Sequence, residues 1–344
     1  MERNERVDAF RVLAIIAVII IHTRPFEHQN LSLDEDFGVA AILNQASRFA
    51  VPFFFAMSGY FWGSKLTESS SALTQCLRPS RRILLTFFAW SIIYLVPTDP
   101  SAYQSTDLTG FIKGIYWRIL SFTANPMALL LQGSKNHLWF LASLLCSLAI
   151  TALLIRIELP RILAILSISL FITGLIGKAY ADTSIGIKSD FNFRNGPFFS
   201  LIFFASGYFL QRSPRKIEYF SIGLPLTLFG ASLHFAEVAY LHEATQARVG
   251  QDYVAGTYFF GMGVALMALN NASTSNLYFL PKLGPSTFGI FLTHFIFIDL
   301  LQPIDRRFSG QIGWEIAQPV LVFLLSLSLT NSLMRSKHTK WLVT

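Results

Sequence analysis

The chain has 344 residues, of which 53% are hydrophobic and only 14% are charged, whereas a soluble domain carries roughly 25% charged residues. This composition excludes an ordinary soluble enzyme and indicates a protein that crosses a membrane several times. The net charge of +7 does not indicate nucleic-acid binding, because no soluble basic domain or arm exists to carry it, and the two cysteines provide neither a disulfide framework nor a metal site.

The apolar runs predict an all-α bundle of about ten transmembrane helices, since one crossing takes ~20 residues. Residues 1–344 then form a single membrane domain. Lys and Arg favour the segments that lie inside when the N-terminus is cytoplasmic, which predicts an N-in orientation, and an even number of crossings places the C-terminus inside as well. The expected spans are 10–26, 45–62, 83–97, 138–155, 162–178, 196–211, 217–240, 253–270, 284–302 and 316–334.

The first span carries an ionisable residue near each end of an apolar run, residues 8–22, DAFRVLAIIAVIIIH. Arg11 and His22 are eleven positions apart, so in a helix they lie within about 20° of the same face and are separated by roughly 16 Å. Ionisable groups inside a membrane helix are costly, which makes both residues functional candidates that address one shared ligand passage. The alternative is structural: Arg11 reaches the headgroups and His22 marks the opposite interface.

Two later segments are similar to each other. Residues 48–63 read RFAVPFFFAMSGYFWG and residues 194–210 read RNGPFFSLIFFASGYFL, so both place an Arg before a Pro and then a Phe-rich run that ends in SGYF. One explanation is an ancient internal repeat. The other is coincidence among the small and aromatic residues that membrane helices use for packing. In either case the Ser-Gly pairs should let neighbouring helices approach closely.

The segment after the second span, LRPSRRILL, contains three arginines in what we expect to be a cytoplasmic loop. Arg78, Arg81 and Arg82 lie on the same side of the membrane as Arg11 in the N-in arrangement, and guanidinium groups suit phosphate oxygens. These residues are therefore candidates to hold a polyanionic ligand, and the alternative is an anchor to anionic lipid. Further along, 103–131 predicts interfacial or re-entrant helices.

A few polar residues lie within the later spans. His137 and Trp139 open the fourth span, His234 and Glu237 are three positions apart on one face of the seventh, and His294 lies in the middle of the ninth. A structural hydrogen bond explains any one of them. Together they indicate a polar site, because a carboxylate such as Glu237 inside a membrane needs a partner or a water-filled cavity.

Five segments, taken in order, resemble the acyltransferase 3 family of integral membrane acyltransferases. They are the first span with Arg11 and His22, RFAVPFFFAMSGYF at 48–61, LRPSRRIL at 77–84, HLWFL at 137–141 and LGPSTFGIFLTH at 283–294. The hallmark of the family is an Arg and a His separated by ten residues in the first span. Only about ten residues follow the last expected span, so we expect no C-terminal SGNH-hydrolase-like domain.

The resemblance implies transfer of an acyl group, usually acetyl from cytosolic acetyl-CoA, to a hydroxyl of a cell-surface glycan or lipid-linked saccharide, at the inner membrane of a bacterium. The expected catalytic residues are His22, as general base or as an acylated relay, and Arg11. The expected cofactor-binding residues are Arg11, Arg78, Arg81 and Arg82, and the expected substrate-binding residues are Arg48, His137, Trp139, His234, Glu237 and His294.

The expected partners are the saccharide acceptor and the lipid bilayer, with no nucleic acid and no metal, while a homodimer and polysaccharide-assembly proteins stay open. Another class of function also fits: a secondary transporter or exporter of a glycan or small solute, with Arg11, His22, Glu237 and His294 along its path. Release of free CoA distinguishes the two, because a transporter moves solute without consuming a thioester.

Overall fold

The computed structural model describes residues 4–27, 37–66, 71–96, 108–213, 219–270 and 279–344. Within these residues the chain is helical and contains no β-sheet, which confirms the all-α fold class. The helices are α1 (Glu5–Thr23), α2 (Val39–Ala46), α3 (Ala50–Gly63), α4 (Ala72–Ile93), α5 (Leu108–Ala124), α6 (Pro126–Gln132), η2 (Asn136–Leu138), α7 (Trp139–Arg156), α8 (Pro160–Ile176), α9 (Pro197–Arg212), α10 (Tyr219–Thr245), α11 (Gly256–Leu269), α12 (Leu280–Leu283), η3 (Gly284–Ser286), α13 (Thr287–Phe308), α14 (Ile312–Arg335) and η4 (Lys340–Leu342).

Each of the ten expected spans falls on a helix or on a pair of consecutive helices. In the described part of the chain, five helical segments are long and apolar enough to cross a membrane, and two further apolar helices, α8 and α11, are shorter. The number of ten crossings and the cytoplasmic location of both termini therefore stay predictions. The five long segments are Val39–Gly63, Asn136–Arg156, Ser221–Thr245, Leu280–Phe308 and Ile312–Arg335.

The expected loop at LRPSRRILL, before the third expected span at 83–97, is wrong. Helix α4 begins at Ala72 and continues through Pro79, so the three arginines lie on a helix and not in a loop. A proline inside a helix removes one backbone hydrogen bond without always ending the helix. Because Pro79 lies among three arginines, the sequence of this segment looks like that of a polar loop. Residue 97 lies outside the described residues, as do 103–107, whereas α5 and α6 confirm that the rest of 103–131 is helical.

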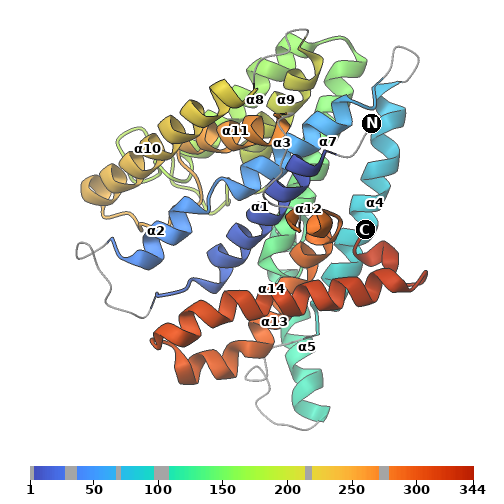
Figure 1. The fold of residues 1–344 in the computed structure, drawn as a ribbon, viewed down its shortest axis with the longest axis vertical. Helices are drawn as coiled ribbons and strands as arrows, with labels where there is room; N and C mark the ends of the chain where they lie inside the picture. Colours follow the sequence, from blue (N-terminus) through green and yellow to red (C-terminus); the bar gives the residue numbers. More distant parts are fainter. Residues whose placement is uncertain (1–3, 28–36, 67–70, 97–107, 214–218, 271–278) are drawn as a thin grey trace.

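Helix α1 occupies the middle of the bundle (Figure 1). It contacts α2, α3, α11, α12, α13 and α14, and most of its apolar side chains are buried, including Ile15 and Ile19. The Asn4 side chain caps its first turn by accepting a hydrogen bond from the backbone N–H of Val7. Of its ionisable residues, Asp8 is therefore buried among other helices, and Arg11 and His22 are partly buried there.

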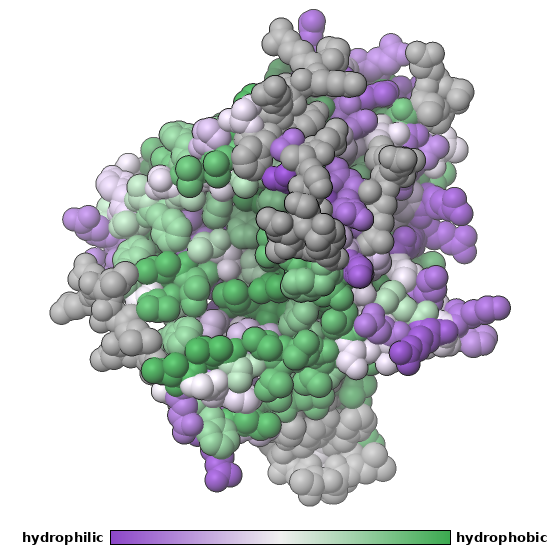
Figure 2. Space-filling model, in the orientation of Figure 1, coloured by the Kyte–Doolittle hydropathy of each residue, from purple (hydrophilic) through white to green (hydrophobic). Residues whose placement is uncertain are grey.

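The outer surface is apolar over much of its area. Figure 2 shows apolar side chains across most of one face, with hydrophilic ones gathered mainly toward its upper right and right edges. Exposed large apolar side chains recur along α8, α10 and α14, for example at Ile165, Leu228 and Val320. Apolar patches of this extent are unfavourable in water and are expected where a helix faces lipid.

The two similar segments pack against each other as helices α3 and α9. A Cβ atom at Gly59 would collide with the backbone carbonyl oxygen of Phe204, and a Cβ atom at Gly207 would collide with that of Ala56. The contact is reciprocal, because each glycine faces the residue three positions before the other glycine. The expected close approach at the two Ser-Gly pairs is confirmed, and glycine is required because only a missing side chain allows the backbones to touch.

Gly59→Ala should destabilise the protein by about 1–3 kcal/mol, because the added methyl group must push two backbones apart. Gly313→Ala is a matched control, since nothing lies within 4 Å of a Cβ at Gly313, which is also in a helix. Thermal unfolding of the detergent-solubilised variants measures the difference. Equal midpoints for the two variants would contradict the close contact.

Candidate functional site

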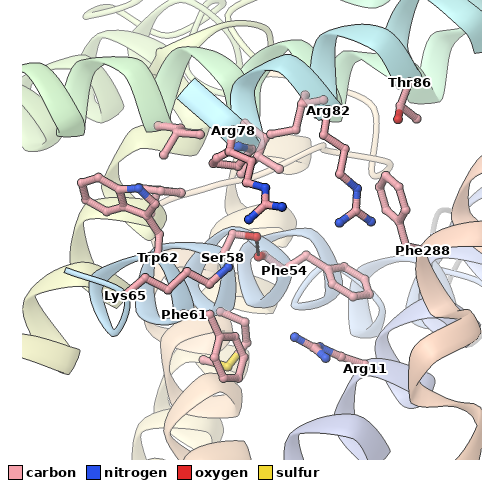
Figure 3. A pocket seen from close by; sticks show the side chains of 16 residues that line it. Arg11, Phe54, Ser58, Phe61, Trp62, Lys65, Arg78, Arg82, Thr86 and Phe288 are labelled. Atoms are coloured by element: carbon pink, nitrogen blue, oxygen red, sulfur yellow. Dashed lines mark hydrogen bonds between the residues drawn. The ribbon is translucent and has the colours of Figure 1, made fainter. Parts of the chain in front are cut away.

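A cavity with a volume of about 730 Å³ lies between the beginning of α1, the end of α3 and the first half of α4. We call it the cationic pocket. Arg11, Lys65, Arg78 and Arg82 line it, and Figure 3 shows Arg78 and Arg82 extending from α4 and Arg11 from α1 toward the same space. None of its described lining residues is Asp or Glu, so its electrostatic potential is positive.

The three arginines of α4 differ in whether they face the cationic pocket, because they lie at different positions around the helix. All three are exposed, but Arg78 and Arg82, four positions apart, line the pocket, whereas Arg81 does not. Arg11 points into the pocket while its Nη1 donates to Asp8 Oδ1 at 3.0 Å. Asp8 is buried, so this pair holds the Arg11 guanidinium at the pocket wall.

Five aromatic side chains, together with aliphatic ones, form much of the remaining wall of the cationic pocket. The Arg11 guanidinium carbon lies 5.1 Å from the Phe61 ring centroid, and that of Arg82 lies 6.0 Å from the Phe288 ring centroid. Trp62 also lines the pocket, and its buried indole N–H has no hydrogen-bond partner among the described residues. Cations, aromatic rings and an unused donor together suit a ligand that carries phosphates and a planar ring.

His22 lies at the other end of α1, beside a separate cavity of about 40 Å³. We call it the His22 cavity. Arg48, Trp139 and Arg194 also line it, together with Asp252. The expectation that Arg11 and His22 share one continuous passage is not met here, because the two side chains line different cavities. Two of the expected substrate-binding residues, Arg48 and Trp139, are brought next to His22.

Three histidines from distant parts of the sequence form a cluster. The ring centroids of His22 and His294 are 5.3 Å apart, those of His137 and His294 are 5.1 Å apart, and Phe295 stacks on His137 with a centroid distance of 4.7 Å. His137 and His294 are completely or almost completely buried. The structure therefore joins three expected site residues that the sequence could place only on separate helices.

The hydrogen bond of His294 fixes its tautomer. Its Nδ1 lies 2.7 Å from the carbonyl oxygen of Phe291, and because a carbonyl only accepts, Nδ1 carries the hydrogen. The Nε2 of the neutral ring is then a bare acceptor, and it has no hydrogen-bond partner within the described chain. A proton acceptor therefore lies within the same cluster as His22.

An ion pair that the sequence did not reveal lies beside this cluster. Lys135 Nζ contacts both carboxylate oxygens of Asp299 at 2.8 and 2.6 Å and lies 5.1 Å from the Phe295 ring centroid. Lys135 comes before the short helix η2 and Asp299 is on α13. No sequence pattern connects them, because the pairing depends on how α7 and α13 pack.

A second ion cluster borders the His22 cavity. Asp252 forms salt bridges with Arg48 at 3.2 Å, Lys178 at 3.0 Å and Arg194 at 3.5 Å. Burial alone would raise the pKa of Asp252, but the three cations outweigh that effect and hold the pKa well below its usual value. We call these four residues the Asp252 network. Arg48 is a site residue predicted from the sequence, but Arg194 is not. The one sequence feature that could have identified Arg194 is that it begins the second of the two similar segments, as Arg48 begins the first.

His234 and Glu237 lie apart from the His22 cavity. The His234 ring nitrogens contact Thr257 Oγ1 at 2.9 Å and Gln45 Oε1 at 2.8 Å. Glu237 accepts hydrogen bonds from the Tyr180 hydroxyl and the backbone N–H of Gly256. Burial and the Glu237 carboxylate raise the pKa of Tyr180, so the phenol stays protonated and donates. These contacts join α10 to α2, to α11 and to the segment after α8.

A series of ring contacts joins the two cavities. Phe54 lines the cationic pocket, and its ring contacts Phe140, whose ring contacts Phe291, which in turn contacts His294. The ring centroids are between 5.2 and 6.3 Å apart. Aromatic side chains therefore form a continuous series of contacts from the cationic pocket to the histidine cluster.

Within the described residues, no group of three or more His, Cys, Asp or Glu side chains is placed to hold a metal ion.

A family model described as an acyltransferase domain matches residues 4–333. No solved structure matches the chain.

Two curated relatives have names that refer to another activity. The chain is 28% identical over 255 residues to an amino-acid racemase of Enterococcus faecalis, and 28% identical over 258 residues to a serine/alanine racemase of Enterococcus gallinarum. These matches cover 68% and 70% of this chain but only 32% and 34% of the relatives. The chain therefore spans about a third of the length of these proteins.

Asp252→Asn should destabilise the protein by roughly 3–5 kcal/mol, because it leaves three partly buried cations without their shared carboxylate. Asp182→Asn is the control, since Asp182 pairs with Lys188 on the surface, where an ion pair contributes little. Thermal unfolding in detergent compares the two, and equal shifts would contradict the role of Asp252.

The low pKa of Asp252 also predicts a pH dependence. Its contribution to stability is fully present above the pKa of an unfolded Asp and is lost only as the pH falls through the lower folded value. The difference in thermal midpoint between wild type and Asp252→Asn should therefore stay constant above about pH 5. A difference that shrinks between pH 8 and about pH 5 would show that the carboxylate is not held ionised.

Proposed function

This chain belongs to the acyltransferase 3 family, and on that premise we propose that it is a membrane O-acyltransferase. It moves acetyl from cytosolic acetyl-CoA to a hydroxyl of a cell-surface glycan or lipid-linked saccharide, in the cytoplasmic membrane of a bacterium. The observation that carries this proposal is the cationic pocket, in which four cations and aromatic side chains converge and, within the described chain, only Arg11 is paired with a carboxylate, that of Asp8, which does not line the pocket. We do not propose racemase activity for this chain, because the match covers only about a third of the length of the two racemases.

The cationic pocket suits coenzyme A in charge and in size. Its volume of about 730 Å³ lies within the roughly 300–1,000 Å³ range of small-molecule sites. Arg78 and Arg82 present guanidinium forks to phosphate oxygens, and the aromatic walls offer stacking surface to the adenine. With the predicted N-in orientation the pocket opens toward the cytosol, where acetyl-CoA is found.

His22 is suited to act as the general base. The acceptor hydroxyl oxygen attacks the thioester carbonyl carbon while the neutral imidazole takes the hydroxyl proton. The carbon–sulfur bond then breaks, and the leaving thiolate of CoA receives that proton, so the products are an ester and free CoA. His294 Nε2, an acceptor without a described partner, helps to keep the proton within the cluster. An acylated His22 that passes the group on is the alternative route.

The acetyl group reaches His22 along the aromatic series from Phe54 to His294. The roughly 16 Å of helix rise between Arg11 and His22 is a distance that the extended pantetheine arm spans. The rings between the cavities must turn aside to admit it. In this proposal the route opens when these aromatic side chains change rotamer, while the helices keep their places.

Arg78→Ala and Arg82→Ala should each weaken acetyl-CoA binding by about tenfold or more, the loss expected when a charge-assisted hydrogen bond is removed. Arg81→Ala is the matched control on the same helix, because Arg81 is likewise exposed but does not line the pocket. Calorimetric titration of the purified protein measures binding. If all three variants lost affinity equally, general surface charge rather than the pocket would explain binding.

His22→Gln should reduce acceptor-dependent CoA release by about 10²-fold or more, while acetyl-CoA binding and the thermal midpoint stay unchanged. Arg11→Lys should also lower the rate, because Lys keeps the charge but loses the fork. Free thiol is measured with the purified protein and glycan extracts. Solute movement without any CoA release would instead support a transporter.

A further inference from the structure

The Asp252 network contains more positive charge than its described partners neutralise. Three cations share one carboxylate, and the four side chains are only 12–25% exposed. The other partner of each cation is a neutral asparagine oxygen: Asn44 for Arg48, Asn192 for Lys178 and Asn136 for Arg194. Three positive charges and one negative charge leave an excess of two positive charges in this cluster.

Such an excess is unfavourable unless something compensates it. Cations that are largely removed from water are normally matched by carboxylates, because their desolvation costs several kcal/mol each. The neutral amides satisfy hydrogen bonds and leave the net charge unchanged. A cluster built in this way stabilises the protein less than a matched set would, and it is arranged to attract an anion.

The geometry also leaves room and an unused donor for that anion. The His22 cavity is bordered by Arg48, Arg194 and Asp252, and its volume of about 40 Å³ holds one or two waters or a group of similar size. Arg194 lies with its guanidinium carbon 4.8 Å from the Trp139 ring centroid, which fixes its plane. Its buried Nε has no hydrogen-bond partner among the residues that the structure describes.

We infer that the His22 cavity recognises a carboxylate on the acceptor, so that the acceptor is an acidic, hydroxyl-bearing molecule such as a uronic acid residue of a saccharide. The carboxylate lies against Arg194 and Arg48, and a hydroxyl of the same molecule then lies close to the His22 ring. A planar carboxylate fits the small cavity and pairs with a guanidinium fork. The inference rests on the proposed function, since it names the acceptor class of the same site.

The test measures binding without any acyl donor. The purified full-length protein in detergent is heated with sodium D-glucuronate, with D-glucose, and with sodium chloride at the same ionic strength. Glucuronate should raise the thermal midpoint in a saturable way, because a ligand that binds only the folded state stabilises it. Glucose and sodium chloride should not. No shift with glucuronate, or equal shifts with glucuronate and sodium chloride, overturns the inference.

Variants locate the binding. Arg194→Lys and Arg194→Gln should each weaken the glucuronate effect by about tenfold or more, and Arg194→Lys keeps the charge if Arg194→Gln does not fold. Lys188→Gln is the control, because Lys188 pairs with Asp182 on the surface. An undiminished glucuronate shift in Arg194→Lys overturns the assignment to this cavity.

The inference and the proposed function can fail separately. Glucuronate binding with no CoA release from acetyl-CoA would support the acidic ligand and contradict the acyltransferase. CoA release with neutral saccharide acceptors, together with no glucuronate binding, would support the acyltransferase and contradict the acidic acceptor. A lower rate in Arg194→Lys with unchanged glucuronate binding would assign Arg194 to the developing oxyanion and would also contradict the inference.

Discussion

The enclosure of α1 by other helices is the constraint on which the site depends. In the described chain at least seven helical elements contact α1, so Asp8, Arg11 and His22 are buried or partly buried in protein, and each needs a partner or a cavity. Arg11 obtains both, from Asp8 and from the cationic pocket. His22 lies against His294 and Phe295 and lines the second cavity. Each cavity therefore lies beside one ionisable residue of the central helix α1.

The crossing of α3 and α9 aligns the second cavity. Gly59 and Gly207 bring the two backbones into contact reciprocally, and each helix is preceded by an arginine, Arg48 or Arg194. Because the helices cross with their equivalent positions facing each other, both arginines reach the same carboxylate, Asp252. This arrangement favours an internal repeat over coincidence, because related halves are expected to contact through equivalent residues.

The two ends of α1 differ in how their cations are partnered. In the cationic pocket no described lining residue is acidic, which suits a polyanion with several phosphates. In the Asp252 network one carboxylate and three asparagine oxygens hold three cations in fixed directions. Cations that are held in fixed directions favour a small anionic ligand whose oxygens match those directions. They discriminate against a ligand that offers negative charge without that geometry. A large donor at one end and a small acidic group at the other are consistent with transfer along α1.

Local sequence determined the helical fold, the family, and Arg11 and His22 as the central residues, because apolar periodicity and fixed spacing along one helix are properties of the chain itself. It did not determine which side chains meet across helices. The pairs Lys135 with Asp299 and Asp252 with Arg194 join residues more than fifty positions apart, and the turn of α4 alone separates Arg81 from Arg78 and Arg82. Those contacts depend on helix rotation and crossing geometry, and only the tertiary structure fixes them.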